Sequence, residues 1–281
     1  MRAVFTWLSL ALMTATVPVS SDAQVLKNLL DNMKQPGASK ASGQPGPTYS
    51  HAKPSISPAD SAAAIKNFMS GTGGSGLLYQ YRVVYTFKKG NKDSTSSDTL
   101  STAVTDGHNI RTDLNFVGAR MQVIGLAGMP RYSVRVFPDS KTYIFNIIDT
   151  AAINSGGGMV YQVTKIGSER VLGYNCIHSR MAIYPAGAKS AGTTEDIWTS
   201  VDVPGYADFK KLALNQNATP KMTQALEEAG CGGSFVKVEM QSKIISMDMQ
   251  LITAERKNFP ASMFQIPPGY TQKSSANPFA R

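Results

Sequence analysis

The amino-acid sequence predicts a mainly β protein (α+β) built on one large, curled antiparallel sheet with helices against its concave face. Apolar and polar residues alternate in about ten segments from Leu77 onward, which is the period of half-buried strands. Turn sequences such as Asp106-Gly107, rather than ten-residue helices, separate most of these segments, so neighbouring strands should be antiparallel. A sheet of this many strands is expected to curl, and the few helical segments would fill its concave side.

The first 23 of the 281 residues read as a secretory leader. Arg2 precedes an apolar run from Ala3 to Val17, and Ser21 and Ala23 supply small residues at the −3 and −1 positions of a cleavage site. A retained membrane anchor is the alternative. No later segment approaches the roughly 18 apolar residues that a membrane span needs. We therefore expect an exported, soluble protein in a Gram-negative periplasm, with no transmembrane segment after leader removal.

The rest of the chain divides by composition into three parts. Residues 24–57 contain a short amphipathic segment and then a flexible linker rich in Pro, Gly and Ser. Residues 58–270 are expected to form a single domain that begins with a helix, because Pro58 suits a first helical turn and an apolar stripe follows it. Residues 271–281 are polar and are predicted to be a disordered tail.

Within the domain, the period-two pattern predicts where the strands lie. Two helices are predicted between the ninth and tenth of these strands. The predicted strands are 77–87, 99–105, 109–114, 119–126, 131–137, 141–148, 159–171, 174–184, 194–201, 235–240 and 244–253. The late helices are predicted at 204–215 and between Pro220 and Gly230, where the proline opens and the glycine closes a segment of helical spacing.

The charge balance favours some partners over others. The chain has 28 basic and 19 acidic residues, a net charge of +9. The lysines are spread out, and neither an arginine-rich helix nor an RNA-binding aromatic signature occurs, so we expect no nucleic-acid partner. The excess charge predicts either a solvated basic surface or attraction to the anionic headgroups of a membrane surface.

Cys176 and Cys231 are the two cysteines of the sequence, an even number for an oxidising compartment. We predict a structural disulfide between them; the alternative is two unrelated thiols, one of them buried. The sequence has no CxxC motif, which argues against thiol catalysis.

Motifs for catalysis, metal binding or cofactor binding are missing from the sequence. The three histidines do not share a metal-ligand spacing. Residues 71–76 match the letters of a dinucleotide-binding loop, but a helix precedes them and a strand follows, which reverses the order that such a loop needs. We therefore predict no catalytic residue, no metal, no cofactor and no enzymatic activity.

Four short segments carry a family resemblance. They are VLGYNC at 171–176, EDIWT at 195–199, VPGY at 203–206 and the closing phrase of Phe264 followed by IPPGY at 266–270. Their order resembles that of an uncharacterised family of exported bacterial proteins, known only as a domain of unknown function, over roughly residues 77 to 270. This family is similar in outline to the outer-membrane lipoprotein carriers of Gram-negative cells. The resemblance implies an unclosed half-barrel with helices across its mouth and an interior that shelters acyl chains.

Large, adaptable apolar side chains are the candidate ligand-binding residues. The sequence has 13 methionines, 11 tyrosines and 11 phenylalanines, and methionine suits surfaces that accept apolar groups of varied shape. The residues expected to line the site are Tyr79, Tyr81, Tyr143, Phe145, Trp198, Met247 and Met249. Ordinary core filling is the alternative role of these side chains.

Three functions are compatible with these observations. The first is a non-catalytic envelope protein that binds or carries a hydrophobic ligand, such as a lipid or the acyl chain of an acylated protein. The alternative is a structural or protein-binding periplasmic module with a filled core and no ligand. The third, a hydrolase assembled from scattered residues, would need a pocket with convergent polar groups.

Overall fold

The structure is a computed structural model that describes residues 58–89, 92–116, 119–147, 159–185, 193–207, 221–241 and 245–273. The helices are α3 (Pro58–Met69) and α6 (Lys221–Glu228), with 3₁₀ turns η2 (Pro138–Ser140) and η4 (Ala261–Phe264). The strands are β1 (Gly74–Lys89), β2 (Lys92–Thr105), β3 (Ile110–Phe116), β4 (Ala119–Gly125), β5 (Tyr132–Phe137), β6 (Thr142–Ile147), β7 (Met159–Val171), β8 (Tyr174–Pro185), β9 (Thr193–Ser200), β10 (Ser234–Gln241), β11 (Ile245–Phe259) and β12 (Thr271–Gln272). The protein is therefore mainly β, as predicted.

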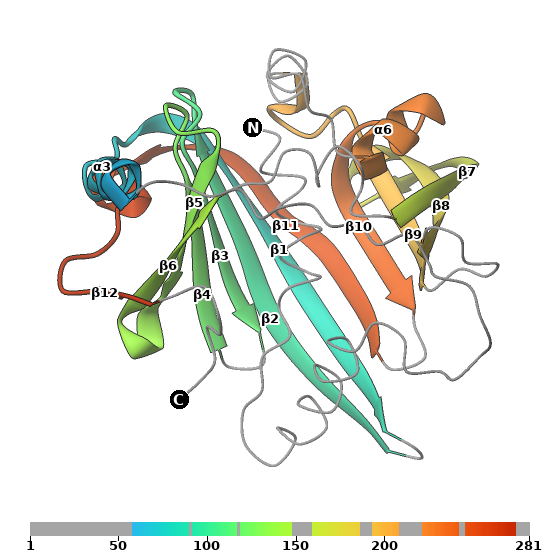
Figure 1. Ribbon diagram of the computed structural model, residues 1–281. Helices are drawn as coiled ribbons and strands as arrows, with labels where there is room; N and C mark the ends of the chain where they lie inside the picture. Colours follow the sequence, from blue (N-terminus) through green and yellow to red (C-terminus); the bar gives the residue numbers. More distant parts are fainter. Residues whose placement is uncertain are drawn as a thin grey trace, which may run out of the picture.

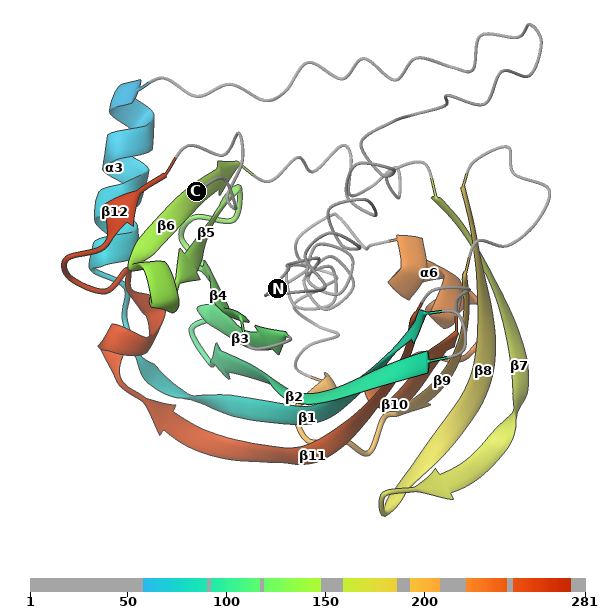
Figure 2. The same ribbon diagram turned by 90° about the horizontal axis from the view of Figure 1, so that it is seen from below.

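All twelve strands belong to one sheet, in the order β12-β6-β5-β4-β3-β2-β1-β11-β10-β9-β8-β7. The strands from β1 to β6 form one meander and those from β7 to β11 form a second, and the long β1–β11 ladder joins the two. Every ladder is antiparallel except the short parallel pairing of β12 with β6. Figures 1 and 2 show that the sheet curls into a trough whose two ends do not meet. The predicted large, curled and unclosed sheet is confirmed.

Each predicted strand is present in the structure, and several of them extend beyond the predicted ends. β2 begins at Lys92, seven residues before the predicted start at residue 99. β11 continues six residues beyond the predicted end at residue 253, because its last residues still pair with the start of β1. The sequence places the end of the ordered domain at Tyr270, whereas Thr271 and Gln272 pair with β6. The predicted leader, the linker and most of the predicted helix at 204–215 lie outside the described residues.

The two helices lie on opposite faces of the sheet, which corrects the prediction that helices cover the concave face together. Figure 2 shows α6 inside the curve of the sheet and α3 outside it. Met222 and Leu226 of α6 are buried against the apolar side chains of the concave face. Phe68 of α3 is buried in a separate apolar cluster on the convex face. Of the two described helices, only α6 therefore lies on the concave side.

The convex cluster is closed by the last segment of the domain. The ring of Phe68 meets that of Phe145 edge to face, with centroids 6.1 Å apart. The backbone N–H of Ile266 donates a hydrogen bond of 2.8 Å to the carbonyl oxygen of Phe68. Phe264 and Ile266 are both buried in this cluster. The closing segment of the domain therefore holds α3 against the convex face of the sheet.

The hairpin between β7 and β8 has a two-residue turn. Val171 pairs with Tyr174, and the two residues between them, Leu172 and Gly173, have φ values of 50° and 88°. Positive φ at both central positions defines a type I′ turn, whose twist matches that of the flanking strands. Leucine rarely adopts this conformation, whereas glycine adopts it freely. The turn thus places an exposed leucine in strained backbone.

The predicted disulfide is wrong, because both cysteines are free and buried. Alternate side chains of a strand point to opposite faces. On β8, Cys176 lies two residues before His178 and shares its face, whereas Ser179 belongs to the other face. Thr199 of β9 shares the face of Ser179, and its hydroxyl donates a 2.8 Å hydrogen bond to the carbonyl oxygen of Cys231. The thiol of Cys231 lies 3.4 Å from the carbonyl oxygen of Ala229. The two thiols therefore lie at different places, that of Cys176 beside the β7–β8 turn and that of Cys231 after the end of α6.

Candidate functional site

The seven predicted site residues lie on two faces of the sheet. The register of β1 with β2 and β11 places Tyr79, Tyr81, Met247 and Met249 on the concave face. Tyr143 and Phe145 belong to the apolar cluster under α3 on the convex face. Trp198 is also on the convex side, because it alternates with Ile197, which faces inward. The structure therefore places four of the seven together on the concave face. Trp198 belongs to the same buried cluster but points to the other face, and Tyr143 and Phe145 belong to a separate cluster.

The concave face is a continuous apolar surface across strands from both meanders. Cross-strand pairing aligns Val83 of β1 with Met249 of β11, Met249 with Val238 of β10, and Val238 with Ile197 of β9. All four side chains are buried and belong to one apolar cluster. Other large members of this cluster on these strands and on β8 include Tyr79, Tyr81, Tyr85, Met181, Ile183, Phe235, Met247 and Leu251.

Two tyrosines of the concave face donate hydrogen bonds from their hydroxyl groups to neighbouring backbone. The hydroxyl of Tyr79 donates a 2.7 Å hydrogen bond to the carbonyl oxygen of Pro204. The hydroxyl of Tyr81 donates to the carbonyl oxygen of Phe235 at 3.3 Å, and burial raises the pKa of Tyr81. Both rings therefore present apolar faces to the trough while their polar ends are satisfied.

The segment that follows β9 connects the concave face to α6. Gly205 has a φ of 83°, and a β-carbon there would collide with the side chain of Leu77. The neighbouring Tyr206 donates a hydrogen bond of 2.8 Å from its hydroxyl to Glu227 of α6. The Val-Pro-Gly-Tyr motif thus packs tightly on β1 through its glycine and fixes α6 through its tyrosine.

One carboxyl group interrupts the apolar surface. Glu195 of β9 lies between Met240 of β10 and Met181 of β8, on the concave side. Among the described residues, no cation or hydrogen-bond donor pairs with it. Burial raises the pKa of Glu195 to about 7, because water solvates the charged form better than the apolar surroundings do. The carboxyl is therefore partly protonated near neutral pH.

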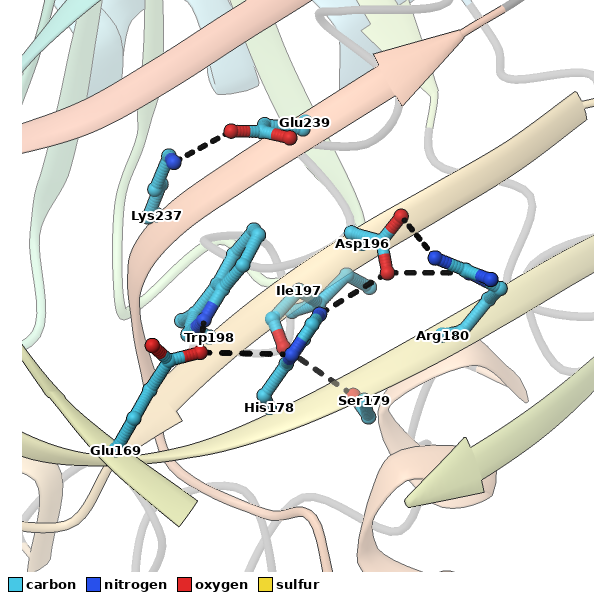
Figure 3. A network of polar contacts seen from close by, with 9 residues as sticks. All are labelled: Glu169, His178, Ser179, Arg180, Asp196, Ile197, Trp198, Lys237 and Glu239. Atoms are coloured by element: carbon cyan, nitrogen blue, oxygen red, sulfur yellow. Dashed lines mark hydrogen bonds and ion pairs between the residues drawn. The ribbon is translucent and has the colours of Figure 1, made fainter. Parts of the chain in front are cut away.

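Trp198 is held on the convex face by a network of polar side chains, which Figure 3 shows from close by. Its ring stacks on the imidazole of His178, with centroids 4.2 Å apart and planes 11° apart. Its Nε1–H donates a 2.6 Å hydrogen bond to Oε1 of Glu169. On its other side the Nζ of Lys237 lies 4.6 Å from the ring centroid. The ring and the Nε1–H of Trp198 are thus occupied by contacts within the protein.

The charges of the same network are paired with one another. Oδ1 of Asp196 lies 3.0 Å from Nε2 of His178, and both carboxylate oxygens accept hydrogen bonds of 3.1 Å from Arg180. Lys237 forms an ion pair with Glu239 on the same strand. Acidic and basic groups thus alternate across β7–β10 on the outer face. These ion pairs explain why charged residues alternate with buried apolar residues along β8–β10.

A serine, a histidine and an aspartate lie close together here, yet they do not form a nucleophile and its base. Ser179 points to the face opposite His178 and donates its hydroxyl to the carbonyl oxygen of Ile197. Nucleophilic catalysis needs a hydrogen bond from the hydroxyl to the imidazole, which the sheet prevents. Within the described ranges, no three His, Cys, Asp or Glu residues are grouped to hold a metal ion. Neither described helix is long and apolar enough to cross a membrane.

Residues 94–270 match the model of a family described as "Domain of unknown function (DUF4412)". The chain belongs to this family. The matched residues contain the four segments of the predicted family resemblance, which is thereby confirmed. In this DUF4412 chain, two of the segments now have structural roles: Leu172-Gly173 forms the β7–β8 turn, and Pro204-Gly205 packs on β1.

Solved structures similar to the DUF4412 chain include the following three. A LolA superfamily protein from Nitrosomonas europaea is 7% identical, with 75% of this chain and 98% of that chain covered and a TM-score of 0.27. Lipoprotein LppX from Mycobacterium tuberculosis is 12% identical, with 69% and 90% covered and a TM-score of 0.30. A putative outer membrane lipoprotein-sorting protein domain from Vibrio parahaemolyticus is 11% identical, with 70% and 91% covered and a TM-score of 0.26. A comparison with curated protein sequences gives no match.

Proposed function

We propose that this protein is a non-catalytic binding protein or carrier of the bacterial cell envelope. Its ligand is the acyl chain of a lipid or of an acylated protein, which lies against the concave face of the sheet. One observation carries the proposal: a single apolar surface extends over β1, β11, β10 and β9 on the inside of an open trough. Tyr79, Tyr81, Met247 and Met249 are the predicted site residues that line it.

The size and composition of this surface suit an acyl chain. The aligned row from Val83 to Ile197 crosses four strands, and strands lie roughly 4.8 Å apart, so the row is about 14 Å long. This is the length of a medium-chain acyl group. Burial of each methylene contributes about 0.8 kcal/mol, and flexible methionine side chains adapt to the shape of the chain.

The place of action and the remaining partners follow from the sequence. A secretory leader would deliver the chain to the periplasm, where lipids and acylated proteins need shelter from water. The net charge of +9 favours contact with an anionic membrane surface during loading or release. Tyr143, Phe145 and Trp198, which lie on the convex side, have structural rather than ligand-binding roles in this proposal.

The test compares lipid bound to two variants that add the same charge at adjacent positions. Met240 is half-buried on the concave face, whereas Gln241 is exposed at the end of the same strand. Wild-type protein, Met240→Lys and Gln241→Lys are purified without detergent and weighed by native mass spectrometry. We expect extra mass, released by organic extraction as lipid, on wild-type protein and on Gln241→Lys, and its loss from Met240→Lys. Circular dichroism establishes that both variants are folded.

A filled-core module without a ligand is the second candidate, and α6 is the observation that favours it. Met222 and Leu226 of this helix already bury part of the concave face beside β7–β9. A wild-type mass without added lipid, unchanged after incubation with acyl lipids, would establish this alternative and contradict the carrier.

A further inference from the structure

Strand β5 places two polar side chains, Ser133 and Arg135, on the concave face. They alternate with Val134 and Val136, which are completely buried in the convex cluster. The register confirms the assignment, because Arg135 lies directly opposite Val123, a member of the concave cluster. Both polar groups therefore face into the trough from the end of the sheet opposite β7–β9.

Arg135 lacks a counter-ion among the described residues. Its cross-strand neighbours are Val123 and Ile144, both buried and apolar. Burial lowers the pKa of Arg135, yet a guanidinium stays charged at neutral pH. Arg111 is the other described arginine that is not exposed, and it forms a bidentate pair with Asp113, with Nη2 at 2.7 Å. Of these two half-buried arginines, Arg111 has a carboxylate partner and Arg135 has none among the described residues.

Ser133 provides the second, independent observation. It is completely buried, and its Oγ makes no hydrogen bond. A buried hydroxyl without a partner is uncommon in folded proteins and points to a group that is absent from the structure. Side chains two apart on a strand lie on the same face and about 7 Å apart. The serine hydroxyl and the long arginine side chain can therefore donate hydrogen bonds to one small group between them.

We propose that Ser133 and Arg135 form an oxyanion-binding subsite that holds the carboxylate or phosphate head of the acyl ligand. The inference rests on the proposed function and specifies its ligand as an acyl lipid with an anionic head. The guanidinium supplies the charge and a fork of N–H donors that matches a carboxylate or a phosphate. The acyl chain then lies along the apolar concave face. The head group accepts hydrogen bonds from both the Ser133 hydroxyl and the Arg135 guanidinium. The apolar neighbours of these two groups offer them no acceptor.

The experiment measures the affinities of three ligands with the same chain and different heads by isothermal titration calorimetry. Laurate and dodecyl phosphate carry an oxyanion, and dodecanol is neutral. For the wild-type protein we expect the two anions to bind about tenfold or more tightly than dodecanol, the range of a charge-assisted hydrogen bond. In Arg135→Gln this preference disappears while dodecanol binds as before. Ser133→Ala weakens the anions alone, by a smaller factor. Arg131→Gln, an exposed arginine just before β5, is the matched control and keeps the full preference.

The outcomes separate the subsite from the proposed function. If dodecanol binds as tightly as the two anions, or if Arg135→Gln still binds the anions more tightly than dodecanol, the subsite is wrong and the carrier function stands. If none of the three ligands binds, the proposed carrier function is wrong. The subsite is then tested separately by the effect of inorganic phosphate on the melting temperature. A rise in melting temperature with phosphate that Arg135→Gln abolishes would support a free oxyanion as the ligand. The absence of such a rise would overturn the subsite as well.

Discussion

Glu195 and Met240 lie directly opposite each other on β9 and β10, so that a carboxyl group faces a thioether on the concave side of the sheet. Met181 borders the same carboxyl from β8. The pairing leaves Glu195 in apolar surroundings, and burial raises its pKa to about 7 from an ordinary value of 4.5. Removal of this group should therefore change how stability depends on pH.

Between pH 4.5 and 7 the folded protein binds more protons at Glu195 than the unfolded chain does. Stability from this residue is greatest below pH 4.5 and falls as the pH rises to 7. We expect Glu195→Gln to lose this decline and to be more stable than wild-type protein at pH 8, by up to about 3 kcal/mol, less where solvent screens the carboxyl. Melting temperatures from pH 4.5 to 8 test this, with the exposed Glu228→Gln as control. Parallel curves for wild-type protein and Glu195→Gln would contradict the assignment.

Gly205→Ala should destabilise the protein more than its positive φ alone explains. The added methyl collides with Leu77 and approaches the Tyr79 hydroxyl that anchors Pro204. Gly269→Ala is the control, because Gly269 has a similar φ of 79° but open space around it. We expect Gly269→Ala to cost about 1 kcal/mol from backbone strain and Gly205→Ala at least about 2 kcal/mol more from the collision. Urea unfolding measures both, and equal losses would show that contact with β1 is unimportant.

Leu172→Asn should stabilise the β7–β8 hairpin. Leu172 has a φ of 50° in the type I′ turn and its side chain is half exposed, so little packing is lost on replacement. Asparagine tolerates this conformation far better than leucine, and the gain should be about 1 kcal/mol. The measurement is the denaturation midpoint. A loss of stability in Leu172→Asn would mean that the leucine makes contacts that outweigh the backbone strain.

Both cysteines should react with a thiol reagent in the denatured protein without prior reduction. Burial raises the pKa of Cys176 and of Cys231, so a thiol reagent should modify the native protein slowly at pH 8. In denaturant we expect two reactive thiols per wild-type chain and one in Cys176→Ser. An intact mass that rises by two hydrogens on reduction would instead reveal a disulfide and a different β8 register.

The period-two pattern was sufficient to predict the strands but not which face of the sheet each apolar set occupies. Tyr143 and Phe145 share a face of β6, as the sequence predicts, yet that face is the convex one beneath α3. The pattern does not mark Ser133 and Arg135 as buried, because polar residues between valines usually point to water. Both faces are buried at this end of the sheet, and a single sequence contains no signal for that.

Local irregularities account for the remaining differences. At the end of β9, Ile197, Trp198, Thr199 and Ser200 are all buried, so burial does not alternate there although the side chains do. Irregular register at Gln80/Tyr81 and at Phe235/Lys237 shifts the pairing by one residue. Trp198 faces outward although its size and apolar character favour the interior. Bulges of this kind depend on both paired strands and are not visible in either strand alone.

The single ladder that joins the two meanders has a consequence for the kinetics of folding. Each meander forms from neighbours in the chain, whereas the β1–β11 ladder joins residues as distant as Gly74 and Phe259. Closure of so long a loop costs chain entropy, so this ladder should form late and limit the folding rate. Until then each half exposes a long unpaired strand edge, which can capture the complementary half of a second molecule. Exchange of halves between two chains is therefore the characteristic misassembly expected of this sheet.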